Sequence, residues 1–402
     1  MDAQPDPRQS EGSDDAMNID DNTVTTCYGE LKRAAWVEVN LAAIKHNVQT
    51  LRGLIGARVK IMAVIKANGY GHGITEVAKT ALDSGAEQVG VAMLQEALQL
   101  RRAGIACPIL VLGCSLPDQA LDIVYNNITQ TVSSVEMAKA LSEAACSLNK
   151  TAHVHVKIDT GMGRLGIDTH KTVEFVTELQ KLSSLIISGV FTHLACADED
   201  DDSFSQLQLE NFRKALQDLT HYSIGTGIIH AANSAAILKY PEAHFDMIRP
   251  GLALYGLPPY PAALDRISLR PSLALKARIV QLKGLSRGSA VGYGQTYTLP
   301  KDTVLAMVPV GYGDGLPRSL SNKGYVLVRG KKAPIVGRVC MDQFAIDIGH
   351  IPHVVPGEVV TIIGNSEKDY ISVLDIANAS GTIQNEIVSA LTERLPRLYI
   401  NE

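Results

Sequence analysis

A lysine ends one of the apolar stretches of the chain and is followed by a glycine-rich turn. Lys66 comes directly after Val59–Ile65, and residues 67–73 contain three glycines together with Tyr70 and His72. A lysine at the end of a buried strand is costly unless its charge is used or suppressed, and such lysines form Schiff bases with carbonyl compounds. An ordinary solvated lysine is the alternative, but the residues beside Lys66 favour a chemical role.

Four further apolar stretches lead into polar residues. These polar ends are Lys157–Arg164, Thr192–His193, His230–Ser234 and Arg249–Gly251. In a parallel barrel the carboxyl ends of the strands carry the reacting groups. Each end alone is compatible with a structural role, but together with Lys66 they predict one reactive site. Ser234 and Gly251 follow the last two strands, where barrels commonly bind phosphate.

Eight short apolar runs alternate with segments of helical spacing. The runs are 59–65, 88–92, 109–112, 128–132, 154–158, 187–192, 227–231 and 245–248, and the helical segments include 74–82, 95–102, 172–182 and 207–219. Continuous apolar strands alternating with helices predict a parallel sheet buried on both faces, and eight units predict a closed (β/α)₈ barrel. A doubly wound open sheet is the alternative, but no Gly-x-Gly-x-x-Gly follows the first strand.

The pattern changes after the proline-rich stretch at 258–261. Strands then follow one another without helices, at 274–282, 304–310, 325–328, 333–336, 344–348 and 359–363. Such spacing predicts a mostly-β domain. Two late segments, 373–380 and 384–391, have helical character. We therefore expect a TIM-like barrel at 34–260 and a C-terminal β domain at 261–402.

Residues 1–33 form an acidic head without an apolar stretch. The first 26 residues contain seven acidic side chains and one arginine, which leaves the remainder of this chain of net charge -5 close to neutral. Such composition predicts a disordered tail that is neither a signal nor a transit peptide, and favours the cytoplasm. The charge balance gives no reason to expect nucleic acid, and no apolar run is long enough to predict a membrane span. The six cysteines lack paired spacing, which predicts reduced thiols, and no metal site is expected.

Val64–Gly73 resembles the cofactor-attachment signature of the alanine racemase family, whose members carry pyridoxal 5'-phosphate (PLP) on a barrel followed by a β domain. The resemblance extends from about Ala35 to Tyr399. Supporting motifs follow in the family's order: Gly161–Arg164, His230–Ser234, Val291–Gly294, Val310–Gly315 and Cys340–Asp342.

The resemblance implies a role for each polar strand end. Lys66 would carry PLP and serve as one catalytic base. The cofactor phosphate would be held by Tyr70, Ser234 and the backbone at Gly251 and Leu252, with Asn233 beside it. Arg164 would bind the cofactor's phenolic oxygen and the substrate carboxylate. Arg249 would face the pyridine nitrogen, with His193 and His230 in the surrounding hydrogen-bond chain.

The resemblance also assigns residues of the β domain. Tyr293 would be the second catalytic base, and Tyr312 and Met341 would complete the substrate pocket. Because the family takes these three residues from the partner subunit, the resemblance implies a homodimer with two shared sites. The implied reaction is the interconversion of L- and D-alanine.

Inversion at Cα requires one base on each face of the substrate. Lysine and tyrosine have reference pKa values of about 10.4 and about 10, so a two-base mechanism requires the pKa values of both side chains to be lowered. An arginine at the pyridine nitrogen does not give up its proton. The cofactor would then be a weaker electron sink, which favours return of the proton over transamination.

Two other classes of protein are alternatives. Fold-related decarboxylases of basic amino acids place an acidic residue at the pyridine nitrogen, whereas Arg249 stands here. Non-catalytic PLP carriers resemble the barrel alone, whereas this chain adds a β domain with Tyr293. A serine or broad-specificity racemase is a further alternative within the same mechanism.

Two positions are open to more than one interpretation. Lys157 stands where many family members carry a carboxylated lysine, which would relieve like-charge repulsion with Arg164; an ordinary lysine pointing away is the alternative. Asn385 replaces a tyrosine that usually closes the active site. The change predicts a larger pocket with a hydrogen-bonding partner for serine, and neutral drift is the alternative.

Overall fold

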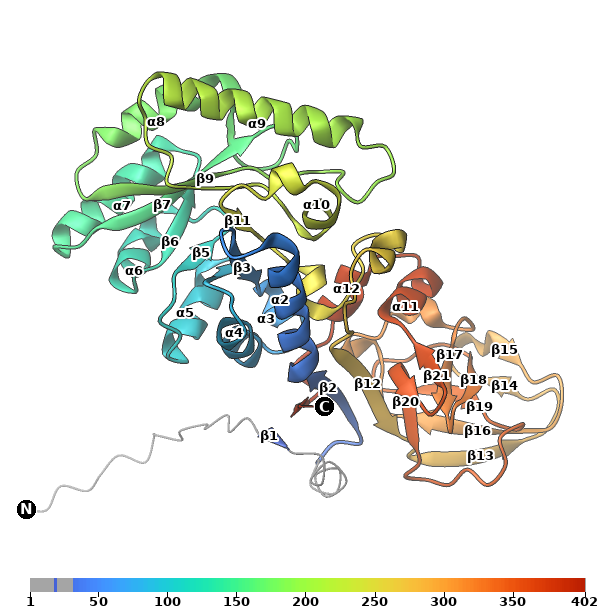
Figure 1. Cartoon of the computed structure of the whole chain (residues 1–402). Coiled ribbons are helices and arrows are strands. Elements are labelled where there is room, and N and C mark those ends of the chain that lie inside the picture. The colour runs from blue at the N-terminus through green and yellow to red at the C-terminus, as the bar shows by residue number, and fades with distance from the viewer. Residues whose placement is uncertain (1–17, 20–31, 402) are drawn as a thin grey trace, which may run out of the picture.

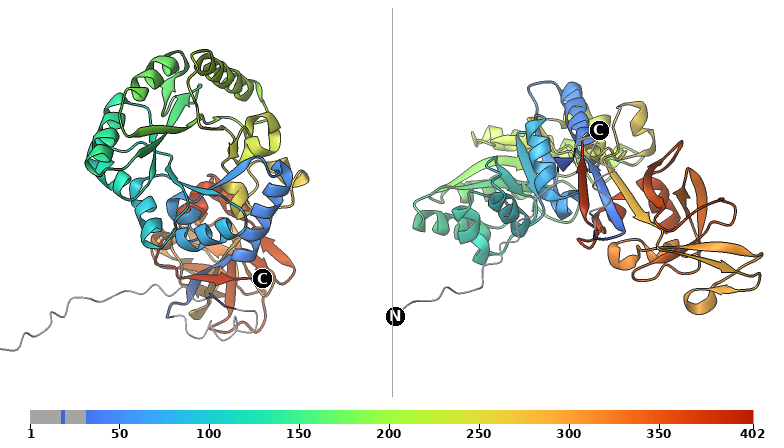
Figure 2. Two further views of the ribbon diagram at one scale, coloured as in Figure 1. Left: turned by 60° about the vertical axis from the view of Figure 1, so that its left-hand side comes forward. Right: turned by 90° about the horizontal axis from the view of Figure 1, so that it is seen from below.

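The computed structural model describes residues 18–19 and 32–401. The N-terminal part is a barrel of eight parallel strands ringed by helices (Figures 1 and 2). Its strands are β3 (Lys60–Val64), β4 (Gln88–Val91), β5 (Ile109–Val111), β6 (Thr129–Val132), β7 (Ala152–Asp159), β9 (Leu185–Phe191), β10 (Ile228–His230) and β11 (Met247–Ile248). They are hydrogen-bonded in the order β10-β9-β7-β6-β5-β4-β3-β11. The predicted (β/α)₈ barrel is confirmed.

The gap between β10 and β11 is bridged by backbone and side-chain hydrogen bonds. Asp246 N–H donates to the Ile229 carbonyl over 3.0 Å, and Ile229 N–H donates to Asp246 Oδ2 over 2.8 Å. Arg249 N–H donates to the Ala232 carbonyl over 3.0 Å. The last two strands therefore bring residues 230–234 and 249–251 together at one end of the barrel.

Helices cover the outside of the barrel, and their apolar faces pack on the strands. They are α2 (Leu41–Ile55), α4 (Ile74–Asp83), α5 (Leu94–Arg102), α6 (Ala120–Tyr125), α7 (Val135–Ser147), α8 (Thr172–Gln180), α9 (Ser203–His221) and α10 (Ser234–Lys239). In α4, for example, Ile74, Val77, Ala78 and Ala81 are buried, which is the i, i+3, i+4, i+7 spacing of one helix face. The short α3 (Lys66–Tyr70) departs from this pattern.

The C-terminal part is mostly β, as predicted. Its strands include β12 (Leu273–Arg278), β13 (Gln281–Leu285), β16 (Thr303–Val308), β17 (Tyr325–Val328), β18 (Lys331–Val336), β19 (Phe344–Asp347), β20 (Val359–Ser366), β21 (Asp369–Ile371) and β22 (Arg397–Ile400). A two-stranded ribbon of β14 (Ala290–Val291) and β15 (Tyr297–Thr298) extends from it. Helices α11 (Val373–Ser380) and α12 (Gln384–Ser389) lie where helical character was expected.

One strand near the start of the chain joins the C-terminal sheet. β2 (Ala35–Asn40) pairs antiparallel with β12 and parallel with β22, so it lies between two segments from the far end of the chain (Figure 2). The predicted barrel range 34–260 therefore contains a strand that belongs to the sheet of the β domain. The predicted disordered tail, residues 1–33, lies outside the described residues, apart from Asn18–Ile19 and residues 32–33. Asn18–Ile19 form the short strand β1 beside β22.

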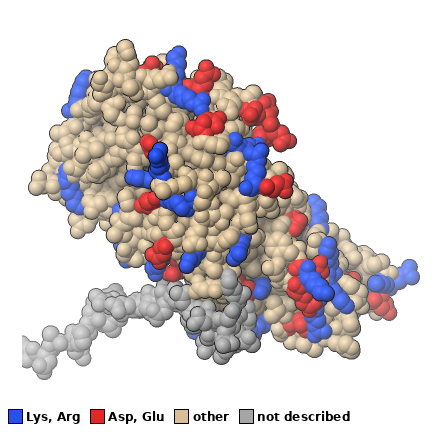
Figure 3. Space-filling model, in the orientation of Figure 1, with Lys and Arg blue, Asp and Glu red and all other residues tan. Residues whose placement is uncertain are grey.

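Surface charge is mixed in sign. On the face shown in Figure 3, acidic and basic side chains are interspersed over both parts of the molecule. Within residues 18–19 and 32–401, no helix combines the length and apolar character needed to cross a membrane. The five cysteines in this part of the chain form no disulfide, and Cys27 lies outside it.

Candidate active site

A cavity of about 260 Å³ opens at the carboxyl ends of the barrel strands. Eleven of the residues predicted for the site line it: Lys66, Tyr70, Lys157, Arg164, His193, Asn233, Ser234, Arg249, Gly251, Leu252 and Asn385. Ten of these come from the barrel, and Asn385 comes from α12. The topology thus gathers residues from six separate segments around one space.

Lys66 does not end a strand, as the apolar run had indicated, but begins the short helix α3. The four residues after it, Ala67, Asn68, Gly69 and Tyr70, have φ values of 52°, 53°, 61° and 51°. They form one turn of left-handed helix, which costs about 1 kcal/mol or more for each residue other than glycine. Such local strain persists only where the surroundings hold it, and it commonly marks a functional segment.

Two side chains hold this left-handed turn. The Glu96 carboxylate accepts the N–H of Ala67 over 2.6 Å and that of Ala92 over 2.7 Å, which ties the turn to the end of β4. Asn68 Oδ1 accepts the N–H of Ile74 over 2.9 Å, which ties it to the start of α4. The backbone directly after Lys66 is therefore fixed from both sides.

The environment of Lys66 favours a neutral amine. Burial lowers the pKa of Lys66, nearby Arg164 lowers it further, and the Glu96 carboxylate acts in the opposite direction. A lysine must lose its proton before it can act as a nucleophile or a base. The surroundings thus shift Lys66 toward the neutral form that the predicted chemistry requires.

Ser234 and Gly251 form a small polar cradle at the end of β10 and β11. Ser234 Oγ accepts the N–H of Gly251 over 2.9 Å and that of Ala253 over 3.2 Å. A Cβ atom on residue 251 would come within 2.6 Å of the Tyr70 hydroxyl, so only glycine leaves this space open. Hydroxyl groups and open backbone suit the oxygen atoms of a phosphate. Asn233 has a structural task here, because its Oδ1 accepts the N–H of Ala236 and caps α10.

Arg249 is buried at the floor of the cavity within a chain of polar groups. Its guanidinium donates to His230 Nδ1 over 2.7 Å, to His193 Nδ1 over 3.3 Å, and to the carbonyls of Thr192 and Ala231, each over 2.8 Å. His230 Nε2 lies 2.8 Å from Nδ1 of His155. The chain His193–Arg249–His230–His155 thus links residues of neighbouring barrel strands, from the end of β11 to β7, and His193 and Arg249 line the cavity.

The direction of donation along this chain follows from arginine, which donates only. His230 and His193 must therefore accept at Nδ1 and carry their protons on Nε2. His230 then donates to His155, and the Nε2–H of His193 is left as a donor away from Arg249. Burial lowers the pKa of Arg249 to about 9, so its guanidinium stays charged at neutral pH.

The three histidines stay neutral at neutral pH. Burial, followed by the charge of Arg249, lowers the pKa of His155 to about 3 and holds the pKa values of His193 and His230 well below the usual range. A neutral ring is needed for the pattern of donors and acceptors described above. The single positive charge of the chain is thus located on Arg249.

Lys157 lies inside the barrel and does not point away. It is 4% exposed, and its Nζ lies 5.1 Å from the centre of the Phe191 ring. Burial, with smaller contributions from Arg249 and Arg164, lowers the pKa of Lys157 to about 8. Three basic side chains, Lys157, Arg164 and Arg249, therefore line the same cavity.

The three predicted residues of the β domain do not line this cavity. The side chains of Tyr293, Tyr312 and Met341 are 73%, 43% and 52% exposed. Tyr293 lies in the turn between β14 and β15. Tyr312 lies on the loop after β16, and Met341 lies on the loop after β18. The single chain thus brings together the barrel part of the predicted site and leaves the β-domain part on its surface.

The sequence interpretation missed several residues of the site. His155 extends the polar chain, and Phe191 stacks on His230 with ring centres 4.7 Å apart. A signal for His155 was present, because it lies two residues before Lys157 on one strand and so shares its face. Gln208 had no such signal: it reaches from α9 to the carbonyl of His193, which only the fold brings near. No cluster of metal-ligating side chains occurs within the described residues.

The fold and the cavity define a two-domain protein with a half-buried lysine and an arginine–histidine chain at the mouth of a barrel. Family models described as alanine racemase, N-terminal domain, and alanine racemase, C-terminal domain, match residues 39–259 and 272–399. The chain is 45% identical over 380 residues to the alanine racemase of Desulfosudis oleivorans, covering 92% of this chain and 97% of the relative. It is 42% identical to that of Methanococcus maripaludis, with 91% and 98% covered. The chain belongs to the alanine racemase family.

Solved structures give the same result. A crystal structure of alanine racemase from Bacillus anthracis with bound L-Ala-P has a TM-score of 0.88 and 38% identity, covering 92% of this chain and 96% of that one. Alanine racemase from Streptomyces coelicolor has a TM-score of 0.87 and 35% identity, covering 93% and 100%. The family resemblance predicted from the sequence motifs is confirmed.

Proposed function

We propose that this chain is a PLP-dependent alanine racemase that interconverts L- and D-alanine with Lys66 and Tyr293 as its two bases. The observation that carries the proposal is Lys66 itself: a half-buried lysine at the start of a strained left-handed turn, lining a cavity that also contains the Ser234–Gly251 cradle and the buried Arg249. The names of the relatives support the same reaction.

The residues of the cavity fit PLP. Lys66 would hold its aldehyde carbon, Tyr70, Ser234 and the backbone at Gly251 and Leu252 would hold its phosphate, and Arg249 would face its ring nitrogen. When bound, the cofactor supplies an electron sink for the bond between Cα and its hydrogen. The space that a Cβ at residue 251 would fill supports this placement.

Each protein group has a defined task in moving the proton. Lys66 would take or return the Cα proton on one face through Nζ, whose pKa burial and Arg164 lower. Arg164 would bind the substrate carboxylate at the rim of the cavity. Arg249 would donate to the ring nitrogen without transferring its proton, because its pKa of about 9 is far above that of a pyridine partner at neutral pH.

The second base would come from another copy of the chain. Tyr293, Tyr312 and Met341 are exposed and lie outside the cavity, so a single chain has a base on one face only. A homodimer in which the β domain of each chain covers the barrel of its partner would supply the missing face. The free Nε2–H of His193 would then be a donor for the phenol oxygen of Tyr293 from the partner.

Serine is proposed as a second substrate. Asn385 lines the cavity from α12, and its side-chain amide has no hydrogen-bond partner among the described residues. It can therefore donate to or accept from a substrate hydroxyl. Small apolar pockets reject one added hydroxyl only by about a hundredfold, and a polar group in the pocket should reduce this discrimination.

The cofactor assignment is tested by reduction with borohydride followed by peptide mapping. The pyridoxyl group is expected on Lys66, together with racemisation of alanine followed by circular dichroism. A label on another lysine, or full activity in protein that carries no label and no PLP, would refute the assignment.

The shared site is tested by complementation. Lys66→Ala and Tyr293→Ala homodimers should both be inactive. After subunit exchange, half of the dimers are hybrids with one complete site each, so about a quarter of wild-type activity should return. Absence of recovery, with exchange demonstrated by a mass or affinity tag, would show that Tyr293 does not act in trans.

A further inference from the structure

The loops that carry Tyr312 and Met341 are joined to each other by their backbones. Tyr312 N–H donates to the Cys340 carbonyl over 3.0 Å, and Gly313 N–H donates to the Met341 carbonyl over 2.9 Å. A Cβ atom on residue 311 would lie 2.2 Å from the Met341 carbonyl oxygen, so the two loops touch at Gly311. The backbone contacts therefore fix the positions of the two exposed side chains, Tyr312 and Met341, relative to each other; these two loops are called the Tyr312–Met341 unit.

Beneath this unit lies a fully buried carboxylate. Asp314 is 0% exposed, and its Oδ2 accepts the N–H of Gly311 over 2.9 Å, while Asp314 N–H donates to the Gly311 carbonyl over 2.9 Å. These two reciprocal bonds close the turn around Tyr312. The shape of the turn thus depends on the side chain of residue 314.

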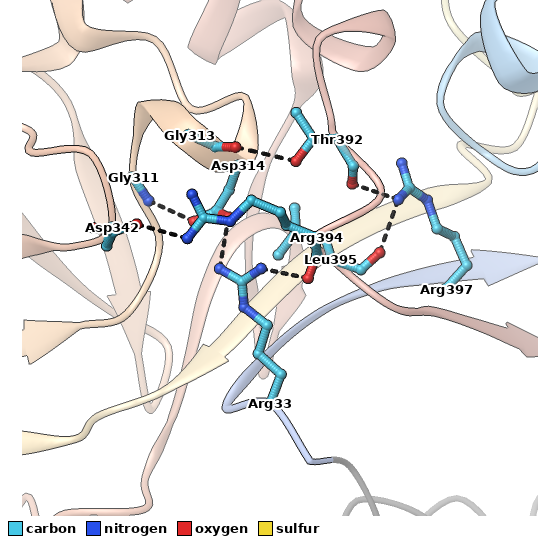
Figure 4. A network of polar contacts seen from close by, with 9 residues as sticks. All are labelled: Arg33, Gly311, Gly313, Asp314, Asp342, Thr392, Arg394, Leu395 and Arg397. Atoms are coloured by element: carbon cyan, nitrogen blue, oxygen red, sulfur yellow. Dashed lines mark hydrogen bonds and ion pairs between the residues drawn. The ribbon is translucent and has the colours of Figure 1, made fainter.

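Two arginines from opposite ends of the sequence neutralise Asp314 (Figure 4). Arg33 donates to Oδ1 over 2.6 Å, and Arg394 Nε lies 3.2 Å from the same oxygen. Arg33 also donates to the Arg394 carbonyl, which joins the two arginine segments. Arg394 in addition donates to Asp342 Oδ1 over 2.6 Å, directly after Met341 in the sequence.

The C-terminal segment also holds the turn by its backbone and by Thr392. Thr392 N–H donates to the Asp314 carbonyl over 3.1 Å, and its hydroxyl donates to the Gly313 carbonyl over 3.2 Å. Gly315 has φ of 100°, and a Cβ there would lie 2.2 Å from the Ala390 carbonyl oxygen. The turn of Tyr312 is therefore packed directly on the strand connection that leads to β22.

We propose that Asp314 is a positioning residue for racemisation. Through the Gly311 turn and through Arg394 it would hold Tyr312 and Met341 in the arrangement that lines the substrate side of the partner's site. This inference rests on the proposed shared-site dimer. Asp314 itself has no exposed surface, so it acts only through the two side chains above it.

The charge of Asp314 is what the arrangement requires. A buried arginine–carboxylate group stabilises its surroundings only while both signs are present, and removal of one partner leaves the other uncompensated. In Asp314→Asn the amide nitrogen would face either the Gly311 N–H or an arginine, which places donor against donor. The turn would relax, and small displacements of substrate-contacting groups are sufficient to weaken substrate positioning strongly.

The test places Asp314→Asn on one chosen chain of the complementing dimer. In the hybrid of Lys66→Ala and Tyr293→Ala chains, the working site uses Lys66 of the second chain and the β-domain loops of the first. Asp314→Asn on the Lys66→Ala chain should raise KM for alanine about tenfold, with kcat changed by less than about twofold. On the Tyr293→Ala chain, where it lies in the dead site, it should leave both constants and the PLP absorbance spectrum unchanged.

This design separates positioning from folding, because a purely structural defect would affect both placements alike. Equal changes in both placements, or no change in either, would overturn the proposal. Failure of the parental hybrid itself would instead refute the shared site, and with it the assignment of Asp314 to a partner's substrate pocket.

Three further variants guard against misfolding. Arg394 is partly exposed, and Arg394→Met removes its contacts with Asp314 and Asp342 while Arg33 still neutralises Asp314. It should raise KM in the same placement, and Arg394→Lys should recover part of the loss. Unchanged KM in folded Arg394→Met would also overturn the proposal. Glu358→Gln breaks a comparable pair with Arg329 between β17 and β20 and should not alter KM.

Discussion

The two parts of the predicted site are built in opposite ways. In the barrel, Arg249 and His230 are themselves buried, and Arg249, His230 and His193 satisfy one another's hydrogen bonds. In the β domain, the assigned groups are exposed, and the buried polar residue is the support beneath them, Asp314. The barrel part is complete within one chain, whereas the β-domain part is a prepared surface.

Because of this difference, we expect substitutions in the two parts of the site to affect stability and activity in different ways. Replacing a buried charged residue removes compensation from its neighbours, so it affects folding as well as function. Replacing an exposed side chain rarely changes stability by more than about 0.5 kcal/mol. Substitutions of buried barrel residues such as Arg249 should therefore reduce both properties, and substitutions at the tips of the β-domain loops should reduce activity alone.

The largest effect on activity is expected at Tyr293 in the exposed β-domain part of the site. Tyr293→Phe should lower kcat for alanine by about a thousandfold, because a missing acid–base group costs roughly 10²–10⁴ in rate. The melting temperature should stay within about 1 °C of the wild type, since the side chain is 73% exposed. Tyr222→Phe, at a tyrosine that is 63% exposed on the barrel, is the matched control. A clear loss of stability in Tyr293→Phe would contradict the comparison.

In the barrel part, substitution of the buried Arg249 should lower the stability of the folded protein. Arg249→Leu leaves His230 Nδ1 and the carbonyls of Thr192 and Ala231 without a donor, which should cost about 3 kcal/mol of stability as well as activity. The measurement is thermal and urea unfolding of both forms with PLP present. Arg266→Leu removes an exposed arginine with one hydrogen bond, to the Leu238 carbonyl, and should change stability little. Equal unfolding curves for Arg249→Leu and wild type would remove the basis of the comparison.

A smaller effect is expected from Lys157, which we propose is carboxylated. Its pKa of about 8 provides neutral amine near physiological pH, the only form that adds carbon dioxide, and the carbamate would pair with Arg164. Loss of one charge-assisted hydrogen bond of about 1.5 kcal/mol corresponds to roughly tenfold. Activity should therefore fall about tenfold in buffer free of carbon dioxide and return with bicarbonate. Lys157→Arg should be insensitive to bicarbonate, and an equally insensitive wild type would argue against carboxylation.

The same lysine predicts a pH dependence of stability in the unmodified protein. Because folding lowers the pKa of Lys157 from 10.5 to about 8, the unfolded chain binds more protons between these values. The destabilisation is therefore fully present below about pH 8 and fades as pH rises toward 10.5. In carbon-dioxide-free buffer, the wild type should gain melting temperature between pH 7.5 and 10 relative to Lys157→Met.

The smallest effect concerns substrate choice at the point where the two parts of the site meet. Asn385→Tyr should lower the ratio of kcat/KM for serine to that for alanine by about fivefold, within the range that a single hydroxyl contact provides. Asn385→Ala, which keeps the space but removes the amide, separates volume from hydrogen bonding. If neither substitution changes the ratio, Asn385 is a position of neutral drift.

Much of the barrel was predictable because its signals are local. Most of the eight strands, though not β6, are rich in apolar residues, and the polar residues that follow several of them meet in the cavity because parallel strands end at one edge. The boundaries of α11 were also predicted, since Ser372 and Gly381 give clear start and stop signals. The sequence therefore supplied most of the cavity wall.

What could not be predicted depends on distant partners. The single expected strand 274–282 is two strands, because β12 pairs with β2 and β20 whereas β13 pairs with β16. The left-handed turn after Lys66 depends on Glu96 and on Asn68, and only the fold brings Glu96 near. Asp314 reads in the sequence as one more polar loop residue, and its burial between Arg33 and Arg394 follows from contacts across almost the whole chain.

The position of β2 has a consequence for the order in which the protein is made. Trp36, Val37 and Val39 of this strand are fully buried between β12 and β22. During synthesis β2 leaves the ribosome early, yet its parallel neighbour β22 ends only at Ile400. At about 5–20 residues per second, β2 waits roughly 20–70 s for that partner. During this time the barrel can close around its own strands and β12 can pair with β2, but the second edge of this apolar strand stays unpaired until β22 has been synthesised.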